Sequence, residues 1–189
     1  METESVDDVL LEVDDKMGKA VDFFKREIAG LRTGKASPAL VENITVDYYG
    51  TPTRLREIAN ISAPEPRLLV INPYDPTSIS AIEKAILAAN IGLTPRNDGR
   101  LLRIPIPELS EERRRELVKV ARKLAEDARV AIRNVRRDAN EAIKQLHKDG
   151  KVSDDDRDAA LEEVQKYTDA RIQEVDQLLA QKEKEIMAV

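Results

Sequence analysis

Cysteine and tryptophan are absent from this 189-residue sequence, and histidine occurs once, at His147. Without cysteine the chain can form neither a disulfide nor a thiolate metal site, and one histidine leaves little for metal binding or general-base chemistry. Aromatic residues make up only 3% of the chain, too few for a platform that stacks single-stranded bases. No apolar run approaches the ~20 residues that a membrane-spanning helix needs. We therefore expect no metal, no cofactor and no membrane partner.

The chain also lacks the signals of export. Residues 1–8 are acidic, with neither the apolar core of a signal peptide nor the arginines of an organelle transit peptide. We therefore expect a cytoplasmic protein.

Charged residues and small aliphatic residues dominate the composition, at 35% charged and 41% hydrophobic. A core of Ala, Leu, Ile and Val suits tightly packed helices. The net charge of −5 is spread unevenly, because residues 113–137 hold ten Lys or Arg against three Asp or Glu. Residues 1–31 and 150–189 are each acidic, at −5. This asymmetry indicates one polyanion-binding element held between acidic neighbours.

Heptad spacing of apolar residues predicts long helices near both ends of the chain. Leu10, Met17, Phe24 and Leu31 recur every seven residues in a first helix that we expect to end at Gly34. A second helix over 110–148 has spacings of three and four throughout, at Val118, Ala121, Ala125, Ala128, Ile132, Val135, Ala139, Ala142 and Leu146. Ser110 is a candidate N-cap for this helix, and Ser153 is one for a third helix that runs nearly to the end.

The middle of the chain has a different pattern. All nine prolines fall between positions 38 and 107, and short strands are expected at 44–48, 68–71 and 101–106. A helix is expected over 77–90, with Ser80 and Glu83 as a capping box.

Together these patterns predict an α+β protein: a long antiparallel three-helix bundle of residues 1–31 plus 108–189, with a small inserted β/α/β domain over 32–107. The chain crosses between the two domains twice. We expect paired hinges at these crossings, made by Arg32, Thr33, Gly34, Pro38, Pro105 and Pro107.

The second helix carries the most informative set of charged residues. Arg122, Arg129 and Arg136 share the e position of the heptad, and the adjacent b and f positions hold Lys119, Lys123, Arg133, Arg137 and Lys144. Guanidinium groups at helical intervals suit a phosphate backbone, since each can offer a bidentate fork. The alternative is a solvated face that pairs with the two acidic helices.

Other candidate sites are weaker. Gly34-Lys35-Ala36-Ser37 lacks the first glycine of a P-loop, because residue 29 is Ala. His147 and the run Asp154–Asp156 fit the charge preferences of helix ends. No nucleophile–base pair stands out, so we expect no catalytic residue and no enzyme activity.

Several strings resemble the ribosome recycling factor family, in that family's order and over essentially the whole chain: Leu31–Pro38, Asp47–Pro52, Asn97–Gly99, Arg103–Pro107, Glu111–Leu117 and Val130–Asp138. The resemblance implies an L-shaped molecule of tRNA-like dimensions. It also implies a monomer that binds the post-termination ribosome through large-subunit rRNA, and that splits the subunits with elongation factor G and its GTP hydrolysis.

The string from Arg133 to Arg137 matches the part of the family associated with rRNA contact. The expected RNA-binding residues are therefore Lys119, Arg122, Arg129, Arg133, Asn134, Arg136 and Arg137. A second hypothesis is a bundle-type adaptor whose basic stripe docks an acidic protein.

Overall fold

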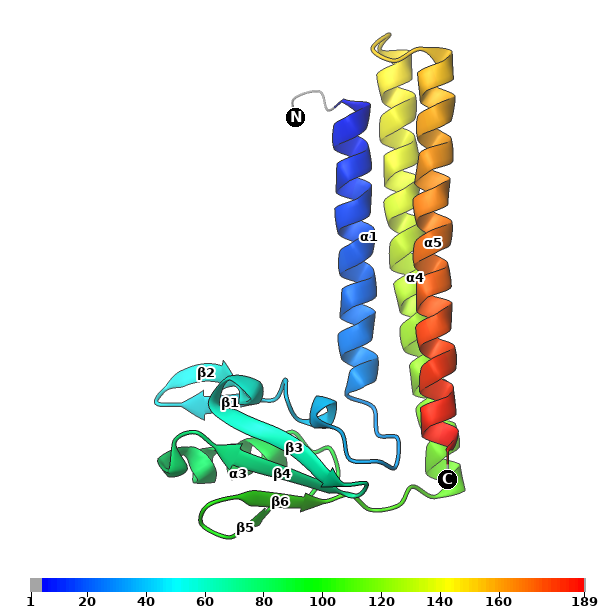
Figure 1. Ribbon diagram of the computed structural model, residues 1–189. Coiled ribbons are helices and arrows are strands. Elements are labelled where there is room, and N and C mark those ends of the chain that lie inside the picture. The colour runs from blue at the N-terminus through cyan, green and yellow to red at the C-terminus, as the bar shows by residue number, and fades with distance from the viewer. Residues whose placement is uncertain (1–4, 189) are drawn as a thin grey trace. The chain divides into compact units, whose positions relative to one another are not determined.

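The computed structural model describes residues 5–188 (Figure 1). It has two compact units. One is made by the chain up to Ile28 together with Val118–Lys184, and the other by Ala29–Leu117 with the residues after Lys184. Long helices pack together in the first unit and a small sheet forms the second, so the predicted α+β class is confirmed.

Most of three long helices forms the first unit: α1 (Val6–Ala29) as far as Ile28, α4 (Glu111–Lys148) from Val118 onward, and α5 (Asp154–Met187) as far as Lys184. Both predicted N-caps are present, since Ser110 Oγ accepts from the Arg113 N–H at 3.1 Å and Ser153 Oγ from the Asp156 N–H at 3.1 Å. A side-chain oxygen at this position satisfies a backbone donor that the helix itself leaves unpaired.

The first helix ends at Ala29, whereas the sequence pattern predicted an end at Gly34. Gly30 follows directly, and glycine costs more backbone entropy in a helix than any other residue. Leu31 therefore lies outside the helix. The buried positions of α1 are Val9, Val13, Met17, Val21, Phe24 and Ile28.

The predicted apolar seam of α4 is largely buried. Ala121, Ala125 and Ile132 are fully enclosed, whereas Val135 and Ala142 are half-buried. Alanine at these positions lets the backbones of neighbouring helices approach closely. The buried residues that the heptad pattern omitted are Leu117 and Ile143.

Two polar residues of α5 are buried where the sequence suggested none, Thr168 and Lys182. Thr168 Oγ1 donates to the carbonyl of Val164 at 2.8 Å, so its hydroxyl is satisfied within the helix. Apolar periodicity does not detect such positions, because the residues themselves are polar.

An ion-pair network joins α1 to α5. Arg171 donates to Asp14 at 3.2 Å and to Glu174 at 3.1 Å, and Lys25 lies 3.1 Å from Glu174. Gly18 lies inside α1 beneath this network: a Cβ added there would be 3.3 Å from Arg171 Nη2. The glycine leaves room for the guanidinium to lie across α1.

The second unit contains a four-stranded antiparallel sheet and a two-stranded hairpin. The sheet has the order β3-β4-β6-β5, made by Ala59–Glu65, Leu68–Pro73, Leu102–Pro105 and Arg96–Asn97. The hairpin pairs β1 (Thr45–Tyr48) with β2 (Thr51–Arg54). The helices are α2 (Leu55–Ile58) and α3 (Ile79–Ala88), and the core includes Val46, Leu55, Leu69, Ile71, Ile82, Ile86, Leu102 and Ile104.

Strands β2 and β3 were not predicted from the sequence, and each contains a proline. Pro52 lies in β2, the second strand of a two-stranded sheet, and Pro64 lies where the pairing of β3 with β4 shifts register between Ser62 and Glu65. Proline is tolerated at sheet edges and bulges because no ladder hydrogen bond is needed there. The chain turns between β1 and β2 at Tyr49 and Gly50, both with positive φ, as a two-residue hairpin turn requires.

The capping box predicted at Ser80 and Glu83 is wrong. The helical segment starts earlier, with a 3₁₀ turn (Pro76–Ser78) whose N-cap is Asp75. Asp75 Oδ1 accepts from the Thr77 N–H at 3.0 Å, and α3 follows with no side-chain cap of its own. Glu83 instead accepts a hydrogen bond from Asn97 Nδ2 at 3.2 Å.

Candidate nucleic-acid interface

The basic stripe lies along α4, where a single uninterrupted helix fixes the spacing of its cations. Between Lys119 and Arg137 the helix rises by roughly 27 Å at ~1.5 Å per residue. The side chains of the stripe fall into two groups. One group pairs with acids of α5, and the other faces solvent.

Arg122 and Arg129 belong to the first group. Arg122 Nε donates to Glu183 at 2.7 Å, and Arg129 donates to one oxygen of Asp176 through Nε at 2.9 Å and Nη2 at 2.6 Å. The Arg129 side chain is 19% exposed and also binds Glu126 at 3.1 Å. The alternative interpretation, a stripe that pairs with an acidic helix, therefore describes these two arginines.

The pKa values of both guanidinium groups are raised. The hydrogen bond to Glu183 is the main cause for Arg122. For Arg129, burial works against the charge, but the hydrogen bonds to Asp176 and Glu126 outweigh it and raise the pKa. The sequence contains a matching spacing, because Asp176 and Glu183 are seven residues apart, as Arg122 and Arg129 are, but that spacing alone does not give the register between the two helices.

The second group faces outward. Lys119, Asn134 and Arg137 are exposed, and so are the neighbouring Lys123 and Lys144. Arg133 is half-buried, with a 3.4 Å contact to Glu126. Within residues 5–188, the side chains of Lys119 and Arg137 form no ion pair. These cations keep their donors available for an external anion.

Arg136 lies between the two groups. Arg136 follows Arg129 by seven residues on α4, and Asp169 precedes Asp176 by seven residues on α5. Because Arg129 pairs with Asp176 and the helices are antiparallel, the register puts Arg136 opposite Asp169. Asp169 accepts a hydrogen bond from Gln165 Nε2 at 2.8 Å. Arg136 is half-buried and makes no ion pair within the described part of the chain. Arg136 therefore resembles Lys119 and Arg137 in having no ionic partner within residues 5–188.

The residues predicted as hinges all lie in the second unit. Arg32 Nη2 donates to the carbonyl of Pro107 at 2.9 Å, which joins the two chain segments to each other. Burial, with Arg113 nearby, lowers the pKa of Arg32. Thr33 is half-buried, Gly34 has a φ of +81°, and Pro38 begins a 3₁₀ turn (Pro38–Leu40).

On the second segment, Pro105 is the last residue of β6 and pairs with Leu68. The Ile106 N–H donates to the carbonyl of Arg67 at 2.8 Å. Two of the predicted hinge residues, Pro38 and Pro105, therefore lie within or at the start of regular structure.

His147 and Asp154 link the end of α4 to the start of α5. Their side chains share a hydrogen bond that, as the main cause, lowers the pKa of Asp154, and Arg157 lies nearby. No group of three potential metal ligands occurs among residues 5–188. No helix in that same range is both long and apolar enough to cross a membrane.

The structure combines a unit of long packed helices with a row of outward cations along one of them. The sequence profile of the ribosome recycling factor family matches residues 24–187. The ribosome-recycling factor of Carboxydothermus hydrogenoformans is 54% identical over 184 residues, which is 97% of this chain and 100% of that one. The chain belongs to the ribosome recycling factor family.

Further relatives support the same family assignment. The ribosome-recycling factor of Bacillus subtilis is 52% identical over 182 residues, covering 96% of this chain and 98% of its own. A solution structure of a ribosome recycling factor superposes with a TM-score of 0.81, at 46% identity, over 98% of this chain and 99% of that one.

A second solved structure contains a factor from T. thermophilus with E. coli elongation factor G on the E. coli post-termination complex. It superposes with a TM-score of 0.71 at 43% identity, over 98% of this chain and 100% of that one.

Proposed function

We propose that this chain binds the post-termination ribosome and, together with elongation factor G and the GTP hydrolysed by that factor, splits it into subunits. Messenger RNA and tRNA are released for a new round of translation. The chain itself is not an enzyme, binds no cofactor, and works as a cytoplasmic monomer. Family membership supports this proposal, and so does the related structure that combines a recycling factor with elongation factor G on a post-termination complex.

The binding surface for large-subunit rRNA is the outward face of α4, made by Lys119, Arg133, Asn134, Arg136 and Arg137. The observation that carries this assignment is the unpaired state of Lys119 and Arg137 among the described residues. An exposed cation without an internal partner binds a phosphate without first breaking an ion pair. Arg122 and Arg129 were also predicted from the sequence to contact RNA, but their bonds to α5 favour a role in holding the bundle together.

The hinge also stays a proposal. Because Arg32 ties the segment before Gly34 to Pro107, we place the pivot on the bundle side of that bond, near Gly30 and Ser110. Such a pivot lets the inserted domain move as one body while factor G acts on it.

Cosedimentation with purified large subunits at increasing salt tests the surface. Arg137→Glu should weaken binding strongly and make the dependence of log affinity on log salt shallower by roughly one unit per lost contact. Lys166→Glu is the matched control, since Lys166 is exposed on α5 and forms no ion pair within residues 5–188. If Arg137→Glu binds like the control, α4 is not the RNA-binding surface. Loss of an acidic protein partner instead of the ribosome would support the adaptor hypothesis.

A further inference from the structure

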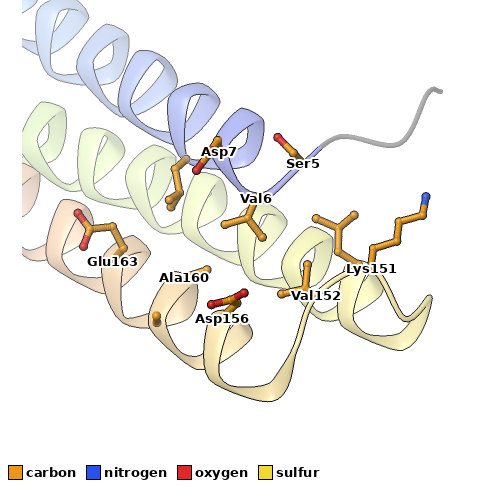
Figure 2. Close-up of a pocket in the computed structure, with 11 residues that line it drawn as sticks. Ser5, Val6, Asp7, Lys151, Val152, Asp156, Ala160 and Glu163 are labelled. Carbon is orange, nitrogen blue, oxygen red and sulfur yellow. The ribbon is translucent and has the colours of Figure 1, made fainter.

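An open groove of about 770 Å³ lies at one end of the helical unit, where α1 begins and the chain turns from α4 into α5 (Figure 2). Its walls come from the first turns of α1, the connection between the helices, and the first turns of α5. The basic side chains of the RNA-binding face line no part of it. The groove is therefore a surface separate from the proposed rRNA contact.

The floor of the groove is apolar and incompletely covered. It is made by Val6, Leu10, Leu146, Val152 and Ala160. Val6, Leu10 and Val152 are only half-buried, and Figure 2 shows the Val6 side chain in the space between α1 and α5. An apolar side chain of a partner that covered this floor would be stabilised, because both surfaces would be removed from water.

Carboxylates line the rim. Asp7 stands on α1, and Asp156 and Glu163 stand on α5. None of the three forms an ion pair with another residue in the 5–188 range. The single cation among the lining residues, Lys151, extends away from the groove in Figure 2.

The positions of two of these acids are explained by the helix ends on which they lie. Asp7 and Asp156 lie in the first turns of their helices, where the partial positive charge of the helix end favours an anion. Glu163 lies more than two turns into α5, too far for that effect, and it is half-buried beside the apolar floor. The Glu163 carboxylate has no cationic partner within residues 5–188, and a cation from a bound partner can supply one.

We propose that this groove binds a lysine- or arginine-rich protein segment that inserts one or two apolar side chains between α1 and α5. The acidic rim repels RNA and also a second copy of the same rim. The chain's own first four residues, two of which are Glu, carry the same sign of charge as the rim. The source of the segment is a ribosomal protein, an assignment that rests on the proposed function.

A peptide experiment tests the groove without ribosomes. The probe is a short synthetic peptide with two leucines one helical turn apart among lysines, and the same peptide with glutamates replacing the lysines serves as its control. The methyl resonances of Val6, Leu10 and Val152 should shift and saturate with the lysine peptide only. Equal shifts with both peptides, or with neither, would overturn the proposal.

Two variants sharpen this test. Glu163→Lys should weaken binding of the lysine peptide about tenfold, because one attraction becomes a repulsion at close range. Glu162→Lys makes the same charge change on the neighbouring exposed residue and should have little effect. Ala159→Trp, at an exposed alanine of the groove wall, should block binding while leaving the melting temperature nearly unchanged. Wild-type affinity in Glu163→Lys and Ala159→Trp would contradict the proposal.

A photoreactive residue at position 159 identifies the source on purified ribosomes. We expect an adduct with a lysine- or arginine-rich ribosomal protein, whereas an adduct with rRNA would contradict the assigned partner. If the protein fails to bind ribosomes at all, the proposed function is wrong, and the peptide experiment still decides what the groove accepts.

Discussion

Two arginines of α4, Arg129 and Arg137, should have opposite roles, and replacing each by glutamine separates them. Arg129→Gln removes three contacts: two with Asp176 Oδ1, at 2.9 and 2.6 Å, and one with Glu126 at 3.1 Å. The carboxylates left behind are solvated, with side chains 52% and 54% exposed, so no buried charge is stranded. We therefore expect a loss near the upper end for exposed ion pairs, about 1 kcal/mol of unfolding free energy.

Arg137→Gln touches none of these contacts. Arg137 is exposed, and such substitutions usually change stability by about 0.5 kcal/mol or less. Binding to large subunits should nevertheless weaken, and the slope of log affinity against log salt should become shallower by about one unit. Arg129→Gln should leave this slope unchanged and lower the melting temperature by about 2–4 °C.

If the two roles are assigned correctly, thermal unfolding changes only for Arg129→Gln, and salt-dependent cosedimentation changes only for Arg137→Gln. The reasoning fails if Arg129→Gln alters the salt slope without changing the melting temperature. It also fails if Arg137→Gln destabilises the bundle and binds ribosomes like the wild type.

Three further predictions follow from the ion-pair network and the chain crossings. Gly18→Ala should raise the free energy of unfolding by less than the ~1 kcal/mol expected for a helix interior, because Arg171 must shift to make room for the new methyl group. In an Arg171→Ala background the same change should give nearer the full value, and chemical denaturation measures both. Burial alone would raise the pKa of Glu174, but hydrogen bonds from Lys25 and Arg171 lower this pKa overall. The contribution of the Glu174 carboxylate to stability is therefore present above about pH 4.3 and is lost as the pH falls further. Glu174→Gln should remove this part of the pH dependence of unfolding. Spin labels on α3 and α5 should report a broad distance distribution in the free protein, and a single sharp distance that persists on the ribosome would contradict the hinge.

The sequence was sufficient to predict α4 and its N-cap because a helix of 38 residues repeats its apolar pattern many times. Short elements have no such redundancy. Pro52 and Pro64 concealed two strands, since proline is excluded only from the paired interior of a sheet and not from its edges. Gly30 was overlooked as the end of α1 because the heptad spacing continued through Leu31.

The stripe on α4 was predictable as a row of cations, but its division into two groups was not. Which arginines face α5 depends on how the two helices are aligned, and one sequence with its own periodicity does not specify the register between helices. The heptad-spaced acids Asp169, Asp176 and Glu183 become informative only when the Arg129–Asp176 pair sets the alignment. The groove beside Val6 was likewise not predictable, because it depends on where α1 starts relative to the α4–α5 connection.

Light scattering of post-termination ribosomes tests the central claim most directly. Adding the purified protein with elongation factor G and GTP should lower the scattered intensity as 70S particles separate, and omitting any of the three should prevent the change. A variant carrying both Arg133→Glu and Arg137→Glu should remain folded and be slow or inactive. No loss of scattering with the folded wild-type protein, or equal rates for the wild type and this variant, would contradict the account.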